Sequence, residues 1–247
     1  MLIDLATTTA GEPEIFASIQ GEGASAGVPC VFVRLSRCNL ACHWCDTPYT
    51  WNWTATPFAH DDRVKWPREE NRVRLDVEDV AGRILALEPF RLVVTGGEPL
   101  VQPGPLAALL AILRRARPAL AVEVETNGTR ALTPALDPLV DQLNLSPKLV
   151  HSGNGPERIV PDVLAWYAAD PRAWFKFVVA REEDVGEVAA LVSAHRLPAD
   201  RVLLMAEGRS SDVLRERRAW LEPLCAEHGW RFTDRAHIHL WGDARGV

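Results

Sequence analysis

Three of the chain's five cysteines stand within eight positions, and this group constrains the fold more than any other feature of the sequence. Cys38, Cys42 and Cys45 have three residues and then two residues between them, in the stretch RCNLACHWCDT. When such a stretch forms a loop, the three sulfurs can turn toward one point and hold a metal. A structural zinc site normally needs a fourth cysteine or histidine, and His43 lies awkwardly between two of the cysteines.

A 4Fe-4S cluster suits this cysteine loop better than zinc. Thiolates hold such clusters, and three protein sulfurs leave one iron free to bind another molecule, which indicates catalysis. Reduced core cysteines, or disulfide partners in an exported protein, are the alternative. We find no apolar export segment, so we expect a cytoplasmic protein. Cys30 lies in an apolar run where a buried side chain is the default, and neither it nor Cys225 is assigned to the cluster.

Length and composition predict one α/β domain. The 247 residues are 47% hydrophobic and 24% charged, which is ordinary for a globular protein. No run approaches the roughly 20 apolar residues that span a membrane. The net charge of -6 argues against a broad contact with nucleic-acid phosphates. We therefore expect a small-molecule substrate, and neither a membrane nor RNA as partner.

Strand and helix patterns alternate about six times after a strand at 14–19. We expect buried strands at 31–35, 90–94, 121–125, from 142, 174–179 and 202–205, and helices at 76–88, 106–115, 163–168, 182–195 and 214–227. This alternation is typical of parallel βαβ units. Because six strands are fewer than the eight of a closed barrel, we predict a partial, laterally open (β/α)6 barrel over residues 1–247.

Two segments depart from this alternation. Residues 51–74 carry tryptophans and prolines among charges without a period, and we predict a long functional loop there, an insertion over about 52–75. The helix after it would begin at Asp76 as N-cap and bury the stripe of Val77, Val80, Ile84 and Leu87. We predict that the tail over about 233–247 closes a substrate pocket. Its paired histidines could be metal ligands, but a strand with hydrogen-bonded or solvated imidazoles is the commoner case and is the prediction here.

Glycines and polar residues follow several predicted strands. They include Gly21 and Gly23, then Gly96 and Gly97, and Glu125 at the end of its strand. Ligands gather at the carboxyl ends of parallel strands, and glycine permits close backbone approach. Arg34 interrupts an apolar strand and needs a carboxylate or phosphate partner, which is either a ligand or a structural salt bridge.

The cysteine spacing, with an aromatic residue just before the last cysteine, resembles the cluster motif of radical S-adenosylmethionine enzymes. TGGEP resembles the motif with which such enzymes hold the amino group of S-adenosylmethionine. Three further stretches, SIQGEG, FVRL and CDTPYTW, narrow the resemblance to one family. Together they resemble the 7-carboxy-7-deazaguanine synthase family of queuosine and 7-deazapurine biosynthesis. The likeness covers most of the chain.

The resemblance implies a lyase that converts 6-carboxy-5,6,7,8-tetrahydropterin to 7-carboxy-7-deazaguanine with loss of ammonia. A 5'-deoxyadenosyl radical, formed from S-adenosylmethionine by the reduced cluster, would take the hydrogen from C6 of the pterin. The family also implies magnesium, an electron donor such as flavodoxin or ferredoxin, and a homodimer.

The family's functional residues map onto this sequence as expectations. The 4Fe-4S cluster would be held by Cys38, Cys42 and Cys45. S-adenosylmethionine would be contacted by Trp44, Asp46, Gly97, Ser146, Pro147, Lys148, Met205, Glu207 and Gly208. The pterin would be bound by Ile19, Gln20, Gly21, Arg34, Thr95, Glu125, His237 and the C-terminal carboxylate of Val247. Thr47 would join the substrate carboxylate around magnesium, although its hydroxyl could equally cap the loop.

Two other functions remain open at this point. An activase that makes a glycyl radical on a partner protein has a similar cluster motif, but we see no reason for Arg34 and the QGEG stretch to recur there. A non-catalytic zinc or iron-sulfur protein is the second alternative. A metal assay separates them, because about four irons per chain would exclude zinc.

Overall fold

The frame of the structure, a computed structural model that describes all 247 residues, is one ten-stranded sheet. Its strands follow the order β10-β9-β8-β7-β6-β5-β3-β1-β4, and β2 pairs with β3 beside this path. The strands are β1 Leu2–Ala6, β2 Ile15–Ile19, β3 Pro29–Leu35, β4 Arg72–Asp76, β5 Arg91–Gly96, β6 Ala121–Thr126, β7 Gln142–Leu145, β8 Ala173–Val179, β9 Val202–Ala206 and β10 Arg231–Thr233. The helices are α1 Arg68–Asn71, α2 Val77–Ala86, α3 Pro103–Ala116, α4 Pro161–Ala169, α5 Asp184–His195, α6 Ser211–His228 and α7 Ala236–Trp241.

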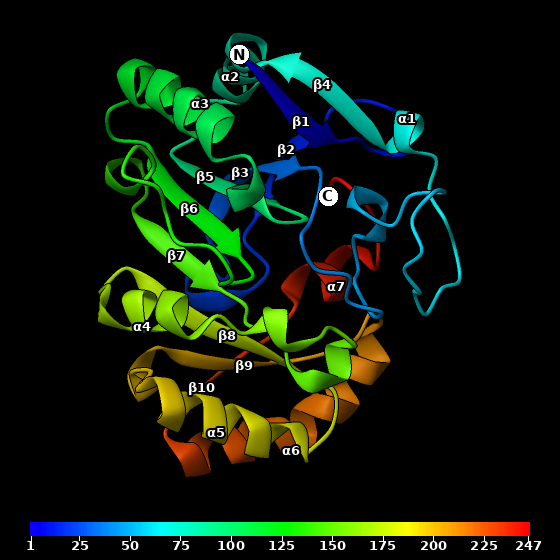
Figure 1. Cartoon of the computed structure of the whole chain (residues 1–247), viewed down its shortest axis with the longest axis vertical. Helices are drawn as coiled ribbons and strands as arrows, with labels where there is room; N and C mark the ends of the chain where they lie inside the picture. Colours follow the sequence, from blue (N-terminus) through cyan, green and yellow to red (C-terminus); the bar gives the residue numbers. More distant parts are fainter.

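The predicted partial, laterally open barrel is confirmed. β3 and β5 through β9 pair in parallel, each with the next, and the edge strands β10 and β4 do not pair with each other. Helices α2 to α6 lie on the outer side of the curved sheet, whereas α7 and the C-terminus lie on its inner side (Figure 1). The carboxyl ends of the parallel strands therefore face the same space as the C-terminal residues.

The sheet continues beyond the predicted strands on both sides. β10 adds a short parallel strand, and β1 pairs antiparallel with both β3 and β4. We expected a tail at β1 and a loop at the start of β4, and both expectations are wrong. The charges on these strands are paired, since the buried Asp4 carboxylate accepts hydrogen bonds from Arg74 Nε at 2.8 Å and Nη2 at 3.2 Å.

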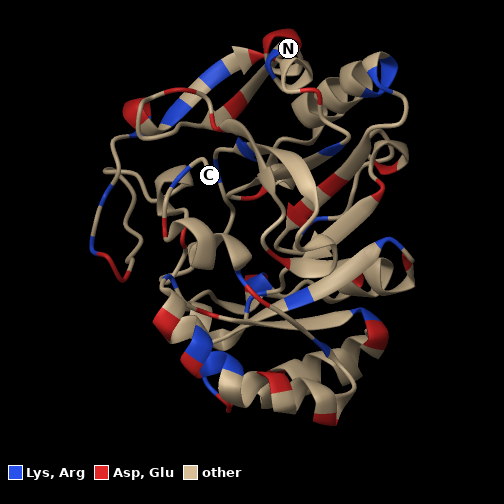
Figure 2. Cartoon of the chain, turned by 180° about the vertical axis from the view of Figure 1, so that it is seen from behind, with Lys and Arg blue, Asp and Glu red and all other residues tan.

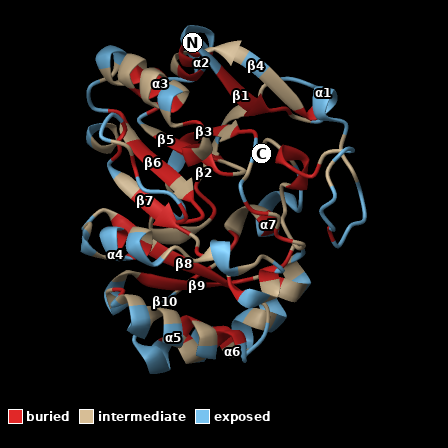
Figure 3. Ribbon diagram, in the orientation of Figure 1, coloured by how far each residue is buried: buried red, intermediate tan, exposed pale blue.

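The core lies between the sheet and the outer helices (Figure 3), and three of the four residues in the predicted stripe of α2 belong to it. On α2, Val77, Val80 and Ile84 are buried, but Leu87 is 40% exposed because the helix ends at Ala86. Asp76 holds the N-cap position with no side-chain cap. Its carboxylate instead accepts a hydrogen bond from the N-terminal ammonium group at 2.6 Å.

The end of the chain forms a helix where a strand was expected. α6 ends at Gly229 in the left-handed conformation, as predicted. After β10, however, the paired histidines lie on α7, with Ile238 between them buried. An alternating pattern this short fits one turn of helix as well as a strand, because periodicity does not separate the two over a few residues.

No helix of the structure is both long enough and apolar enough to cross a membrane. Seen from behind, acidic and basic positions are interspersed along the ribbon (Figure 2).

Because Ile84 is buried on α2 and Leu87 is exposed at its end, truncating the two side chains should lower the free energy of unfolding by different amounts. Ile84→Ala removes a fully buried side chain and is expected to lower the free energy of unfolding by about 2 to 5 kcal/mol. Leu87→Ala is the matched control, with an expected loss of less than about 1 kcal/mol because the residue lies past the helix end and is 40% exposed. Chemical unfolding of the two cluster-free variants measures both. Equal losses would show that α2 packs differently.

Candidate active site

A cavity of about 580 Å³ lies at the carboxyl ends of the parallel strands. Its wall includes nearly every residue that the sequence predicted for a ligand: Ile19, Gln20, Gly21, Arg34, Cys38, Cys42, Trp44, Cys45, Asp46, Thr47, Thr95, Gly97, Glu125, Ser146, Lys148, Met205, Glu207, His237 and Val247. Pro147 and Gly208 are not in this wall. Segments that are distant in sequence thus surround one space.

The three clustered cysteines line this cavity, and each sulfur receives one N–H donor. The backbone of Leu40 donates to Cys38 at 3.4 Å, Asn154 Nδ2 to Cys42 at 3.2 Å, and Trp51 Nε1 to Cys45 at 3.5 Å. The cavity side of the loop also requires Gly97, since a Cβ there would lie 2.2 Å from the Arg37 carbonyl oxygen. The loop and the end of β5 are therefore in close backbone contact.

These cysteines fit an iron-sulfur cluster. Burial raises the pKa of the Cys45 thiol to about 11 and raises those of Cys38 and Cys42 as well, so thiolates there need a positive charge such as metal supplies. N–H groups directed at sulfur suit thiolate ligands. The indole N–H of Trp44, in the same wall, is buried without a partner. As the side chains stand, no three Cys, His, Asp or Glu residues are gathered closely enough to hold a single metal ion, the three cysteines included.

Three predicted pterin contacts form one hydrogen-bonded set. Glu125 accepts from Thr95 Oγ1 at 2.7 Å and from Gln20 Nε2 at 3.1 Å. Gln20 also donates to the buried Glu123 at 2.7 Å, and its amide oxygen accepts from the Glu22 backbone at 3.3 Å. Because protein groups engage both ends of the Gln20 amide, its side chain is fixed and Glu125 is held toward the cavity.

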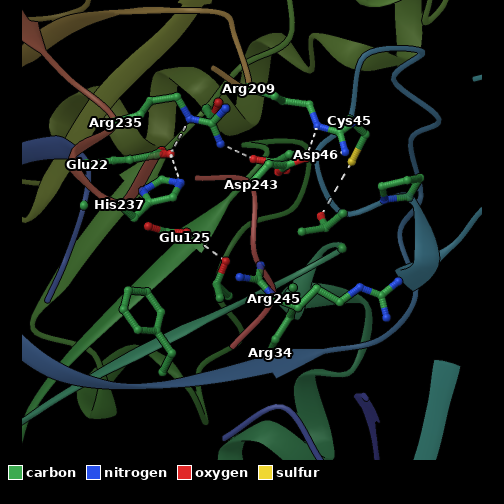
Figure 4. A pocket seen from close by; sticks show the side chains of 18 of the residues that line it. Glu22, Arg34, Cys45, Asp46, Glu125, Arg209, Arg235, His237, Asp243 and Arg245 are labelled. Carbon is green, nitrogen blue, oxygen red and sulfur yellow. Dashed lines mark hydrogen bonds and ion pairs between the residues drawn. The ribbon is translucent and has the colours of Figure 1, made fainter. Parts of the chain in front are cut away.

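Arg34 makes the structural salt bridge that was one of the two alternatives for it. Its Nε donates to Glu14 Oε1 at 2.7 Å, and Glu14 also accepts from the Tyr49 hydroxyl at 3.0 Å. The two Nη atoms make no hydrogen bond, although the side chain lines the cavity (Figure 4). One edge of the guanidinium is therefore anchored, and the other is available to an anion.

A buried ion network that the sequence analysis missed crosses the cavity wall (Figure 4). Glu22 pairs with Lys176 and with Arg235 Nε, the latter at 3.0 Å, and Arg235 Nη2 pairs with Asp46. Burial alone would raise the pKa of Glu22, but the two cations hold it well below its usual range. Burial lowers the pKa of the neighbouring His237. Lys176 had a recognisable signal, a charge inside the apolar strand AWFKFVV, whereas Arg235 had none.

The C-terminal segment is fastened to the insertion. The Arg245 guanidinium lies 3.4 Å from the ring centre of Tyr49 and 4.5 Å from that of Trp66, distances typical of cation–π contacts. Arg209 bridges Asp62 and Asp243 at 2.7 Å each. These contacts place the last five residues in the cavity wall.

The start of the tail packs closely on the turn after β2. The backbone N–H of Ala236 donates to the Gly21 carbonyl at 2.9 Å. A Cβ at Gly21 would lie 2.3 Å from the His237 ring. Gly21 is therefore needed for this close approach.

Two hydroxyls near the cysteine loop face the cavity without a carboxylate partner. Thr47 occupies the N-cap position of the short 3-10 helix Pro48–Thr50 yet makes no cap hydrogen bond. Its Oγ1 lies 3.6 Å from Cys45 Sγ. Ser146 accepts from Lys148 Nζ at 2.8 Å, and that ammonium makes no ion pair. The site therefore keeps, beside the cysteines, a hydroxyl whose one partner is a sulfur and a cation without an ion pair.

The glutamate of the TGGEP motif does not reach the cavity. Glu98 is fully buried and accepts from the backbone of Leu100 at 3.0 Å and of Asn127 at 2.7 Å. Burial raises its pKa. In this chain the motif presents the backbone of Gly96 and Gly97 to the site, while its carboxylate joins the ends of β5 and β6.

Comparisons with known proteins point in one direction. Residues 33–151 match the Radical SAM superfamily. A 7-carboxy-7-deazaguanine synthase of Pyrobaculum aerophilum is 41% identical over 237 residues, which cover 94% of this chain and 95% of the relative. That of Hyperthermus butylicus is 36% identical and covers 91% of this chain and 90% of the relative. The crystal structure of QueE from Escherichia coli has a TM-score of 0.65 at 25% identity, covering 96% of this chain and 95% of the other.

Proposed function

The chain belongs to the 7-carboxy-7-deazaguanine synthase family, and from this premise we propose how its own residues serve the family's reaction. As a radical S-adenosylmethionine lyase it converts 6-carboxy-5,6,7,8-tetrahydropterin to 7-carboxy-7-deazaguanine with release of ammonia, a step of queuosine biosynthesis that uses a 4Fe-4S cluster, S-adenosylmethionine and Mg²⁺. The relatives decide against an activase or a non-catalytic metal protein. The observation that carries the proposal is that the three clustered cysteines, Arg34 and the hydrogen-bonded set around Glu125 line one cavity.

Cys38, Cys42 and Cys45 are proposed as the cluster ligands. When bound, the cluster and S-adenosylmethionine supply the one-electron chemistry that removes hydrogen from C6 of the substrate. The protein's part is to bind, orient and exclude water. The buried residues around the thiols exclude water, and a dry site protects reactive species from side reactions.

The cofactor contacts are assigned to the side of the cavity nearest the cysteine loop. Lys148 carries a cation without an ion pair and is proposed to hold the methionine carboxylate of S-adenosylmethionine. Trp44 offers its unpartnered indole N–H, and Asp46, oriented by Arg235, offers carboxylate oxygens to hydroxyl groups. The remaining proposed contacts are Gly97, Ser146, Met205 and Glu207.

The substrate is assigned to the part of the cavity lined by Arg34 and Glu125. Arg34 would bind the pterin carboxylate with its two free Nη atoms, because the guanidinium fork matches a carboxylate. Glu125, held by Gln20 and Thr95, would accept hydrogen bonds from ring N–H groups. The proposed pocket is completed by Ile19, Gly21, His237 and the Val247 carboxylate.

Thr47 is proposed to join magnesium to the substrate carboxylate. Magnesium prefers oxygen ligands and usually takes only one or two from the protein. The Thr47 hydroxyl makes no cap hydrogen bond, and its contact with Cys45 Sγ at 3.6 Å still leaves an oxygen lone pair for a metal. The remaining proposals rest on the family alone: an electron donor such as flavodoxin or ferredoxin, a homodimer, and a cytoplasmic location.

Removing any one thiol should remove the cluster. Cys38→Ala, Cys42→Ala and Cys45→Ala are each expected to lose it, because all three sulfurs line one cavity. Cys225→Ala, whose sulfur is buried on α6, should retain it. Iron content and visible absorbance after anaerobic reconstitution measure this, and a full cluster in Cys42→Ala would refute the assignment.

Arg34→Lys should raise the KM for the carboxylated pterin by roughly tenfold to a hundredfold, the loss expected for a charged hydrogen bond of about 1.5 to 3 kcal/mol. Arg74→Lys is the matched control, since Arg74 also forks onto a carboxylate but lies outside the cavity. Steady-state kinetics distinguish them. An unchanged KM in a stable Arg34→Lys protein would make this arginine purely structural.

Thr47→Ala should keep the cluster and lose most of the rate response to added magnesium, with stability changed by less than about 0.5 kcal/mol because no cap is lost. Thr50→Ala provides the control. Its hydroxyl donates to the Thr47 carbonyl at 2.8 Å, so that variant should lose about 0.5 to 1.5 kcal/mol and keep its magnesium response. Magnesium titration of the rate beside unfolding measurements decides, and the reverse pattern would exclude Thr47.

A further inference from the structure

Two of the three N–H donors to the cysteine sulfurs come from outside the cysteine loop. Leu40 belongs to the loop, but Asn154 follows the 3-10 helix Val150–Ser152, and Trp51 begins the insertion. Neither Asn154 nor Trp51 has a role among the proposed ligand contacts. Their contacts lead to one further assignment.

Asn154 is fixed in a single orientation. Its Oδ1 accepts from the Ala41 backbone at 2.8 Å, while its Nδ2 donates to Ser152 Oγ at 3.0 Å and to Cys42 Sγ at 3.2 Å. Reversing the amide would place an oxygen against the sulfur and two N–H donors against the Ala41 N–H. The hydrogen-bond partners therefore settle the amide orientation, and the N–H faces sulfur.

Trp51 is held by the insertion itself. Its ring is 5% exposed and meets Phe58 and His60 edge-on, at centroid distances of 5.8 and 6.4 Å. His60 Nε2 also bonds the Cys45 carbonyl oxygen at 2.8 Å. Lys65 fastens the same segment, since its ammonium donates to the Phe58 carbonyl at 2.6 Å. The insertion thus packs the indole N–H against Cys45.

We propose that Trp51 and Asn154 are positioning residues that set the reduction potential of the cluster, and that holding Trp51 in place is a function of the insertion. The assignment rests on the proposed cluster ligands. An N–H dipole directed at a thiolate sulfur stabilises the more negative, reduced state, and hydrogen bonds to sulfur are one of the ways in which proteins tune such clusters. Removing a donor should make the cluster harder to reduce.

The sharpest test replaces one indole by a ring of similar shape without the donor. Trp51→Phe should reduce up to about tenfold less readily, which is a midpoint up to about 59 mV more negative for one electron. Trp53→Phe is the matched control, because the Trp53 indole donates to the Tyr49 carbonyl at 3.1 Å and not to sulfur. It should leave the midpoint unchanged. Redox titration followed by electron paramagnetic resonance, on reconstituted protein without S-adenosylmethionine, measures both variants.

Asn154→Asp gives an independent measurement. It keeps the oxygen that accepts from Ala41 but replaces the donor with a negative charge, so above neutral pH the midpoint should fall further than in Trp51→Phe. Fully loaded variants with the wild-type midpoint would overturn the proposal. So would an equal shift in Trp53→Phe, or loss of the cluster in both Trp51→Phe and Asn154→Asp, since the two side chains would then only support the fold. A wild-type chain that binds no cluster would instead refute the proposed ligands.

Discussion

A charge can enter the dry interior of this protein only if something there compensates it, and this requirement organises the cavity. An unpaired buried charge costs several kcal/mol. Glu22, Asp46, Lys176 and Arg235 satisfy one another, two acids against two bases. Two cations of the cavity wall keep donor atoms without an ion pair, namely the Nη atoms of Arg34 and the ammonium of Lys148. They match two ligands that each bring a carboxylate.

The same network explains why segments far apart in sequence converge. Arg235 precedes α7 yet bonds Glu22 after β2 and Asp46 beside the last clustered cysteine. Asn154 and Trp51 approach the cysteine loop from two other directions. The sheet supplies Arg34 on β3 opposite Thr95 on β5, and further along it Glu125 on β6 and Lys176 on β8. Side chains from the loops and the tail complete the site on that frame.

The sequence predicted the repeating part of the fold and most of the cavity wall, because both depend on local patterns. Apolar runs marked the parallel strands, and the cysteine spacing marked the loop. The antiparallel edge was missed because β4 reads RVRLD, whose charges look solvated until they meet the buried Asp4. Arg235 was missed because its partners lie 213 and 189 positions away. A pairing at that distance leaves no local signal, whereas Lys176 inside an apolar strand does.

The bridge from Arg209 to Asp62 and Asp243 has a kinetic consequence. All three side chains are 34 to 37% exposed, and exposed ion pairs contribute only about 0 to 1 kcal/mol each, less in salt. The insertion and the tail are thus joined at this point by contacts that thermal motion breaks readily. The buried pairs of Glu22 are far costlier to separate. The insertion and the tail can therefore separate at the Arg209 bridge during ligand exchange while the buried ion pairs of Glu22 stay intact.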